Sequence, residues 1–139
     1  MNKLPAIISS IQQSGTILLV DADVEGQGFS ALLIESVSRP EWLDVGKAVD
    51  LVFKETEVSL AKNLQGKISM RNRMKCQVLK VDKGELLSMI TLQFNNFTIV
   101  SAITTRSVNS LQIELGDEVD ALVKANEVSL MKTPQAGIK

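Results

Sequence analysis

The chain has 139 residues, of which 45% are hydrophobic, and its 15 Lys and Arg residues nearly balance its 16 Asp and Glu residues. This length suits one domain or two very small ones, and the apolar fraction is enough to form a core. The net charge of −1 argues against a dedicated nucleic-acid-binding protein, because a polyanionic partner selects for a strong basic excess.

Absent residue types narrow the function further. The sequence contains no His, which excludes an imidazole general base and an imidazole metal ligand. Aromatic residues make up 4% and Tyr is missing, so a base-stacking surface is not expected. The single cysteine, Cys76, excludes an internal disulfide and fits a reducing compartment. With no signal peptide or membrane-spanning run expected, these features predict a cytoplasmic binding protein rather than an enzyme.

The chain divides into two successive sets of short apolar strands separated by turn residues. The first set is expected at residues 5–11, 16–22, 29–34, 47–54 and 57–61. Pro40, before the fourth strand, favours a turn or the start of a helix rather than a strand. The second set is expected at residues 76–82, 86–94, 97–103, 118–124 and 127–131. Residues 104–111 are polar and alternate poorly, which predicts one or two helical turns.

An internal repeat relates the two sets. The segment GKAVDLVFKETEVSLAK from Gly46 and the segment GDEVDALVKANEVSLMK from Gly116 share nine residues at an offset of seventy. Chance is a poor explanation for that many matches in one ungapped window, so we expect a first module at 1–64 and a second at 65–139. Five strands with one helical excursion predict an all-β protein of two tandem OB-like small barrels, each with a short helical turn.

Three short motifs in the second module resemble a known family. Ser69-Met-Arg-Asn-Arg opens the module, Thr104 and Ser107 lie three residues apart, and Lys124 is followed by Ala125. In this order they resemble the Ser-Ala-Arg-Asn, Thr-x-x-Ser and Lys-Ala motifs of molybdate-binding Mop (molybdenum-pterin-binding, TOBE-like) modules. Over nearly its whole length the chain is similar to tandem-Mop molbindins and to the molybdate-binding half of molybdate-responsive transcription regulators.

The resemblance implies which residues hold the oxyanion. Carried over by position, the ligands are the side chains of Ser69, Arg71, Thr104, Ser107 and Lys124 and the backbone of Ala125, with Met70 and Asn72 as secondary candidates. None of these positions is acidic, and two are cationic, as a tetrahedral dianion requires. In the family, the Ser-x-Arg motif comes from one module and the other ligands from a neighbouring one. This predicts a homodimer or a larger even homo-oligomer with the site between subunits.

Each of these motifs also has an ordinary structural explanation. A Ser-x-Arg segment is usually a solvated strand end, and Thr104 with Ser107 is usually a helix cap. Lys124 is matched by Lys54 in the first module, so it serves equally well as a barrel residue. Cys76 corresponds to Ala6 and is expected to be a small packed residue.

The first module lacks most of the motif residues. At the offset of seventy, Ile34 and Val37 replace the two hydroxyl residues, and Glu55 replaces Ala125 with a carboxylate that repels an anion. We therefore expect this module to be structural. Its Trp42, the only tryptophan, is expected to be a hydrophobic plug near the helical turn.

The sequence thus predicts a cytoplasmic protein that binds molybdate, and tungstate too, for storage, buffering or sensing. The metal would be held as its oxyanion, with no protein-metal site, no other cofactor, no membrane association and no nucleic-acid partner. Two alternatives stay open: a ligand-sensing domain of a molybdate-responsive regulator or transporter ATPase, and an OB-type nucleic-acid-binding module.

Overall fold

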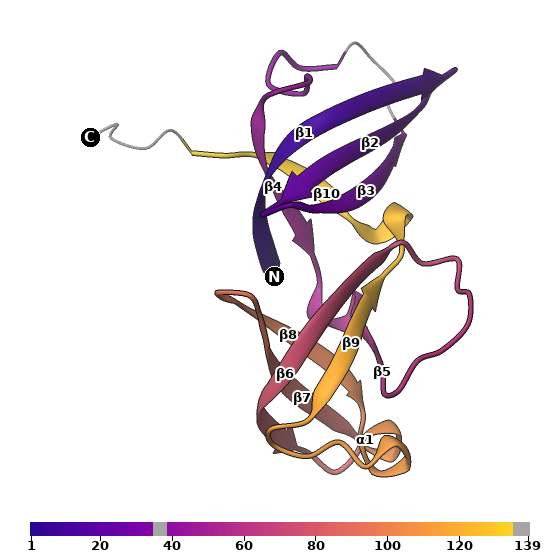
Figure 1. Ribbon diagram of the computed structural model, residues 1–139, viewed down its shortest axis with the longest axis vertical. Coiled ribbons are helices and arrows are strands. Elements are labelled where there is room, and N and C mark those ends of the chain that lie inside the picture. The colour runs from indigo at the N-terminus through magenta and orange to yellow at the C-terminus, as the bar shows by residue number, and fades with distance from the viewer. Residues whose placement is uncertain (35–38, 135–139) are drawn as a thin grey trace. The chain divides into compact units, whose positions relative to one another are not determined.

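The computed structural model describes residues 1–34 and 39–134, and most of its regular secondary structure is β-strand (Figure 1). The strands of the first copy are β1 (Asn2–Ser14), β2 (Ile17–Val24), β3 (Gln27–Ile34), β4 (Ala48–Phe53) and β5 (Ser59–Ala61). Those of the second copy are β6 (Asn72–Lys83), β7 (Leu87–Phe94), β8 (Phe97–Thr104), β9 (Glu118–Val123) and β10 (Ser129–Lys132). One α-helix, α1 (Thr105–Leu111), and two 3-10 turns, η1 (Glu55–Glu57) and η2 (Ala125–Glu127), complete the described elements. The all-β prediction is confirmed.

The strands form two five-stranded sheets with the same topology. Their strand orders are β10-β4-β1-β2-β3 and β5-β9-β6-β7-β8. The first long strand of each copy is interrupted by a bulge, between Ile8 and Ser10 in β1 and between Val78 and Lys80 in β6. Because a bulge bends its strand, β6 can pair with β9 over its first half and with β7 over its second. The edge strands also touch, β5 with β8 and β10 with β3, so each sheet curls into the small barrel that the sequence predicts.

Each sheet takes its fifth strand from the other copy of the repeat. Strand β10 pairs with β4, where Leu130 lies opposite Leu51, and β5 pairs with β9, where Leu60 lies opposite Ala121. The chain accordingly forms two compact units: unit 1 is Met1–Asn2 with Phe53–Lys124, and unit 2 is Lys3–Val52 with Ala125–Lys139. The modules expected at 1–64 and 65–139 follow the repeat in the sequence, whereas each compact unit combines parts of both copies.

Alternating side chains fill the core of unit 1. Along β6, Met74, Cys76 and Val78 are buried, as strand periodicity requires, and Val108 is the buried residue of α1. Cys76 is 2% exposed, which confirms its expected role as a small packed residue. The core is completed by buried residues of the neighbouring strands, namely Ile90, Leu92, Ile99, Val119 and Ala121.

The buried thiol of Cys76 leads to a prediction about reactivity and alkaline stability. Burial raises its pKa to about 12 from an ordinary 9.0, and the Asp120 carboxylate adds to the shift. Because the thiolate is the nucleophile, we expect the native protein to resist iodoacetamide at about pH 8.5 and to react once unfolded in urea. Mass spectrometry of the alkylated chain measures this directly.

The same shift sets a pH window for stability. The folded chain keeps a thiol proton that the unfolded chain releases, so the free energy of unfolding should fall as the pH rises from about 9 towards 12. Urea titrations of the wild type and of Cys76→Ala, which copies Ala6, would isolate the effect of the thiol. Parallel pH dependences in the two proteins would contradict the prediction.

Two expectations for the first copy turn out differently. Leu43 is the buried residue of its turn at 2% exposure, whereas Trp42, which was expected to be a hydrophobic plug, is half-buried. The turn itself is closed by a hydrogen bond from the Leu43 N–H to the Pro40 carbonyl, as the proline favours. Of the helical segment expected here by analogy with α1, residues 35–38 lie outside the described part, and residues 39–41 form no helix.

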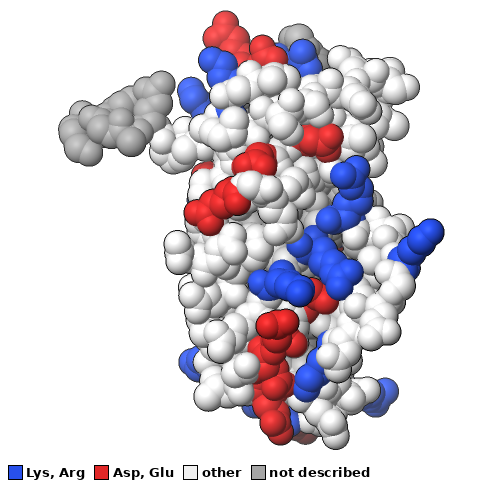
Figure 2. Space-filling view, in the orientation of Figure 1, with Lys and Arg blue, Asp and Glu red and all other residues white. Residues whose placement is uncertain are grey.

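The surface carries both signs of charge. On the face drawn in Figure 2, basic and acidic side chains are interspersed on a mostly uncharged surface, in keeping with the net charge of −1. Within residues 1–34 and 39–134, no helix is long and apolar enough to cross a membrane.

Candidate functional site

Three of the predicted ligands lie at one end of the unit 1 sheet, and a fourth, Ala125, follows the last of them in the chain. In the ladder between β6 and β9, Asn72 lies opposite Val123, so the residues just beyond them, Arg71 and Lys124, follow at the same end. Ser69 precedes Arg71, and Ala125 follows Lys124 as the first residue of η2. We call Ser69, Arg71, Lys124 and Ala125 the basic end.

The basic end offers hydrogen-bond donors and positive charge. Ser69, Arg71 and Lys124 are all exposed, and the guanidinium can donate two parallel hydrogen bonds to one oxyanion. The Ala125 N–H opens a 3-10 turn, and the first N–H groups of a helix have no partner inside it. Together these groups can bind an anion.

The secondary candidates are less available. Asn72 is 1% exposed, so its side chain lies in the protein interior. Its counterpart in the first copy, Asn2, has a structural role: its amide donates to the Val100 carbonyl at 2.9 Å and accepts from the Val100 N–H at 2.8 Å. Met70 is partly exposed between the two polar residues of its motif and brings no hydrogen-bond donor of its own side chain.

The two remaining ligands form the N-terminal cap of α1. The Thr104 Oγ1 accepts a hydrogen bond from the Ser107 N–H at 3.1 Å, and its hydroxyl donates to the Ser107 Oγ at 2.9 Å. The cap proposed from the sequence is therefore present. Thr104 is exposed and Ser107 partly so, and we call these two residues the hydroxyl pair.

A neighbouring residue that the sequence did not single out holds the hydroxyl pair in place. The Thr105 hydroxyl donates to the Gly84 carbonyl at 2.8 Å and shares a 2.7 Å hydrogen bond with the Ser88 hydroxyl. The Thr105 N–H also donates to the Leu86 carbonyl at 2.9 Å, which ties α1 to the turn before β7. Nothing in the sequence distinguishes Thr105 from Thr104, because the turn that it contacts lies some twenty residues earlier.

The surface beside the hydroxyl pair is hollowed and partly apolar. A pocket of about 560 Å³ is lined by Glu85, Leu86, Thr104, Thr105, Arg106 and Asn109. Leu86 is 82% exposed and Leu87 is 53% exposed, which is unusual for leucines that adjoin a polar cap. Arg106 adds a positive charge here, whereas Glu85 adds a negative one.

The basic end and the hydroxyl pair lie at opposite ends of the unit 1 sheet. Thr104 lies opposite Leu87, level with the far end of β6, whereas Arg71 precedes its first residue. At about 3.3 Å per residue, the strand path between these levels is roughly 40 Å, so no single small anion of one unit can touch both groups. Figure 1 shows this separation, with α1 at one end of the sheet and the start of β6 at the other.

This arrangement changes the expected grouping of the ligands. The family resemblance groups Lys124 and Ala125 with the hydroxyl pair, but the register of β6 against β9 places them beside Arg71. The physical reason is the antiparallel pairing, which brings the end of β9 next to the start of β6.

The first copy carries a carboxylate at the matching position. Met1 corresponds to Arg71 and Glu55 to Ala125, and the Met1 ammonium forms a 2.7 Å ion pair with the Glu55 carboxylate. The hydrogen bond from this ammonium lowers the pKa of Glu55. Ile34, the counterpart of Thr104, is 81% exposed, and Val37 lies outside the described residues.

Comparison with known proteins gives one family match. Residues 68–130 match the TOBE domain family. This segment contains all six residues of the basic end and the hydroxyl pair.

Among the residues that the structure describes, no group of three or more His, Cys, Asp or Glu side chains could hold a metal ion.

The names of three similar proteins all refer to molybdenum or molybdate. The chain is 30% identical over 129 residues to the molybdenum import ATP-binding protein ModC of Brucella abortus, a match that covers 79% of this chain and 36% of that protein. It is 29% identical over 63 residues to a probable molybdenum-pterin-binding protein of Haemophilus influenzae, covering 45% of this chain and 91% of that one. Its fold matches a crystal structure of the cytoplasmic molybdate-binding protein ModG with molybdate bound at a TM-score of 0.89 and 24% identity, covering 95% and 96% of the two chains.

These likenesses differ in what they establish. The match to ModG confirms the predicted fold of two tandem small barrels. The chain spans about a third of the length of the ModC relatives, so it corresponds to one part of those proteins.

Proposed function

We propose that this chain, which carries a TOBE domain at residues 68–130, binds molybdate as its tetrahedral oxyanion and accepts tungstate in the same way. The names of the similar proteins support the ligand, since one is an import protein for molybdenum and another a molybdate-binding protein. The observation that carries the proposal is the basic end, where two exposed cations meet without a carboxylate among the four residues.

The complete site forms between two copies of the chain. The basic end of one copy supplies Ser69, Arg71, Lys124 and the Ala125 N–H, and the hydroxyl pair of a second copy supplies Thr104 and Ser107. The separation of the two groups within one unit supports this arrangement. A homodimer, or a larger even assembly, then has one oxyanion site per chain.

An apolar surface supports this assembly. Leu86 and Leu87 are 82% and 53% exposed, and they adjoin the hydroxyl pair through the Leu87–Thr104 pairing. Burying these leucines under a second copy removes apolar surface from water and at the same time brings that copy's basic end to the hydroxyl pair. The second copy of the chain that completes the oxyanion site therefore also covers the exposed leucines.

The role that follows is storage, buffering or sensing of molybdate in the cytoplasm, without catalysis. The ModC likeness favours a second candidate, because the chain matches about a third of an ATP-binding import protein. In that case the same oxyanion site would serve as the ligand-sensing part of a transporter ATPase. Whether the natural reading frame encodes a nucleotide-binding domain upstream distinguishes the two roles.

Titration calorimetry with molybdate, tungstate, sulfate and phosphate tests the proposed ligand. We expect molybdate and tungstate to bind with a stoichiometry of about one per chain, and sulfate and phosphate to bind far more weakly. Pocket size separates these anions, since all four offer oxygen acceptors. Equal affinities for all four would contradict the molybdate assignment, and binding by a strict monomer at full stoichiometry would contradict the shared site.

A further inference from the structure

An ion pair in unit 1 joins the end of β5 to the turns before β9, and the corresponding position in unit 2 has no such ion pair among the described residues. In unit 1, the Lys62 ammonium donates to the Gln112 carbonyl at 2.7 Å and forms a 2.9 Å ion pair with Asp117. The hydrogen bond from Lys62 lowers the pKa of Asp117. This contact joins the end of β5 to the turns before β9, so this position needs no further ligand.

In unit 2 the repeat keeps the lysine of this contact and changes its two partner residues. At the offset of seventy, Lys132 corresponds to Lys62, Trp42 to Gln112, and Lys47 to Asp117. The acid is thus replaced by a second lysine. Within the described part of the chain, neither Lys47 nor Lys132 forms an ion pair, so both positive charges are available to an anion.

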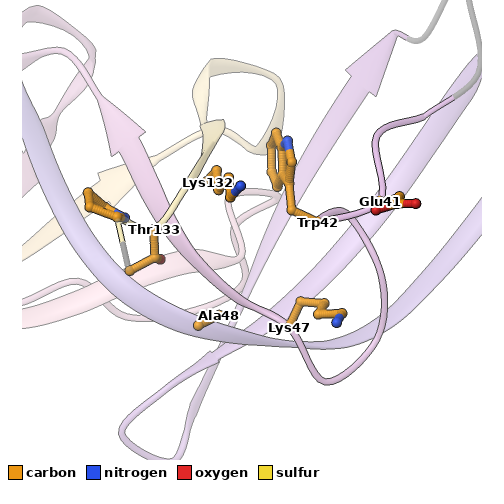
Figure 3. Close-up of a pocket in the computed structure, with 7 residues that line it drawn as sticks. Glu41, Trp42, Lys47, Ala48, Lys132 and Thr133 are labelled. Carbon is orange, nitrogen blue, oxygen red and sulfur yellow. The ribbon is translucent and has the colours of Figure 1, made fainter. Parts of the chain in front are cut away.

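The result is a pocket of about 770 Å³, drawn in Figure 3. Trp42, Lys47, Lys132 and Thr133 are among its lining residues, and Glu41 is the one acid among the described residues of the lining. The indole of Trp42 is half-buried and so presents part of its ring to the pocket. The Thr133 Oγ1 is buried and has no hydrogen-bond partner among the described residues.

We propose that this pocket binds a small anion that carries a planar ring, the chemistry of a nucleoside monophosphate. The lysines neutralise the anionic group, the indole stacks on the ring, and the Thr133 hydroxyl is a buried group that lacks a partner. The volume lies within the usual range for small-molecule sites and is much larger than a bare oxyanion requires. The pocket shares no residue with the basic end or the hydroxyl pair, so it is a second site, independent of the one for molybdate.

The fluorescence of Trp42 reports on this pocket directly, because it is the only tryptophan in the chain. The full chain is titrated with adenosine monophosphate, with adenosine and with inorganic phosphate. We expect saturable quenching by the monophosphate, and at least tenfold weaker binding of adenosine and of phosphate, which each supply half of the chemistry. The proposal would be overturned if the monophosphate caused no saturable change in fluorescence. It would also be overturned if adenosine or phosphate bound as tightly as the monophosphate.

A charge reversal supplies a second test. Lys47→Asp restores at position 47 the acid that unit 1 has at Asp117, and it removes one of the two lysines from the pocket lining. We expect this variant to bind adenosine monophosphate at least tenfold more weakly than the wild type, with an unchanged molybdate isotherm. Lys80→Asp makes the same charge change at an exposed position of β6 and should leave the monophosphate affinity unchanged. Wild-type affinity in Lys47→Asp, or an equal loss in Lys80→Asp, would refute the proposed pocket.

Discussion

The Arg71→Ala variant is expected to lose molybdate binding while keeping the stability of the wild type. Arg71 is exposed and precedes the first residue of β6, so its removal leaves no cavity and no unpaired buried group. The bound dianion, in contrast, loses its bidentate cationic partner. Truncating one partner of a close charge pair costs about 2–5 kcal/mol, which corresponds to a loss of affinity of roughly 30- to 4,000-fold.

Calorimetry and urea denaturation of the same preparation check both halves of this expectation. Lys80→Ala removes an exposed cation from the same strand and serves as the matched control, with unchanged molybdate affinity. If Arg71→Ala binds molybdate normally, the residue assignment at the basic end is wrong. If it loses stability along with binding, the lost affinity no longer identifies a ligand.

Mixing two defective variants tests whether the site is shared between chains. Arg71→Ala lacks a working basic end, and Thr104→Val lacks a working hydroxyl pair, so each alone should bind weakly. A mixed assembly contains interfaces at which an intact Arg71 of one chain meets an intact Thr104 of the other. Refolding the two variants together should therefore restore a fraction of the sites with wild-type affinity. A mixture that binds no better than its components would contradict the inter-subunit site.

The sequence predicted the barrel architecture because the relevant signals are local. Alternating apolar residues set strands such as β7 and β8 to within a residue or so of their expected bounds. The helix cap at Thr104 and Ser107 was also predictable, since its hydrogen bond spans only three residues. Repetition at an offset of seventy then extended each assignment from one copy to the other.

The features that were missed depend on contacts between distant residues. The proximity of Arg71 to Lys124 follows from the pairing of β6 with β9, and no pattern within either segment encodes that register. The exchange of β5 and β10 escaped prediction for a similar reason, because a short strand with the right alternation fits either sheet equally well. At the turn of the first copy, residue type favours Trp42 as the hydrophobic plug, whereas its smaller neighbour Leu43 is the residue that is buried.

Arg73, two residues from the proposed ligand, is expected to affect stability instead of binding. Its guanidinium forms a 3.0 Å ion pair with Asp120 and a 3.3 Å hydrogen bond with the Leu64 carbonyl. The Asp120 side chain is only 10% exposed, and its Oδ1 has no partner in the described part of the chain, so the carboxylate depends on Arg73. Arg73→Met leaves this buried charge without its partner while preserving most of the side-chain volume.

We expect Arg73→Met to lower the free energy of unfolding by about 2–3 kcal/mol. Loss of one partner from a fully buried pair costs about 3–5 kcal/mol. We expect a smaller loss here because the Arg73 side chain is 37% exposed and partly screened by water. Urea denaturation measures the change, and calorimetry at a temperature where the variant is folded should show wild-type molybdate affinity.

The double variant Arg73→Met with Asp120→Asn tests whether the lost stability comes from the unpaired Asp120 charge or from the other contacts of Arg73. Replacing the carboxylate by an amide removes the charge that Arg73→Met leaves unpaired, so most of the lost stability should return. If the double variant is as unstable as Arg73→Met, the arginine stabilises unit 1 through its packing and its bond to Leu64, not through Asp120. Even in that case, Arg71 and Arg73 would differ in function. Among the described residues, Arg73 forms an ion pair with a carboxylate and Arg71 forms none.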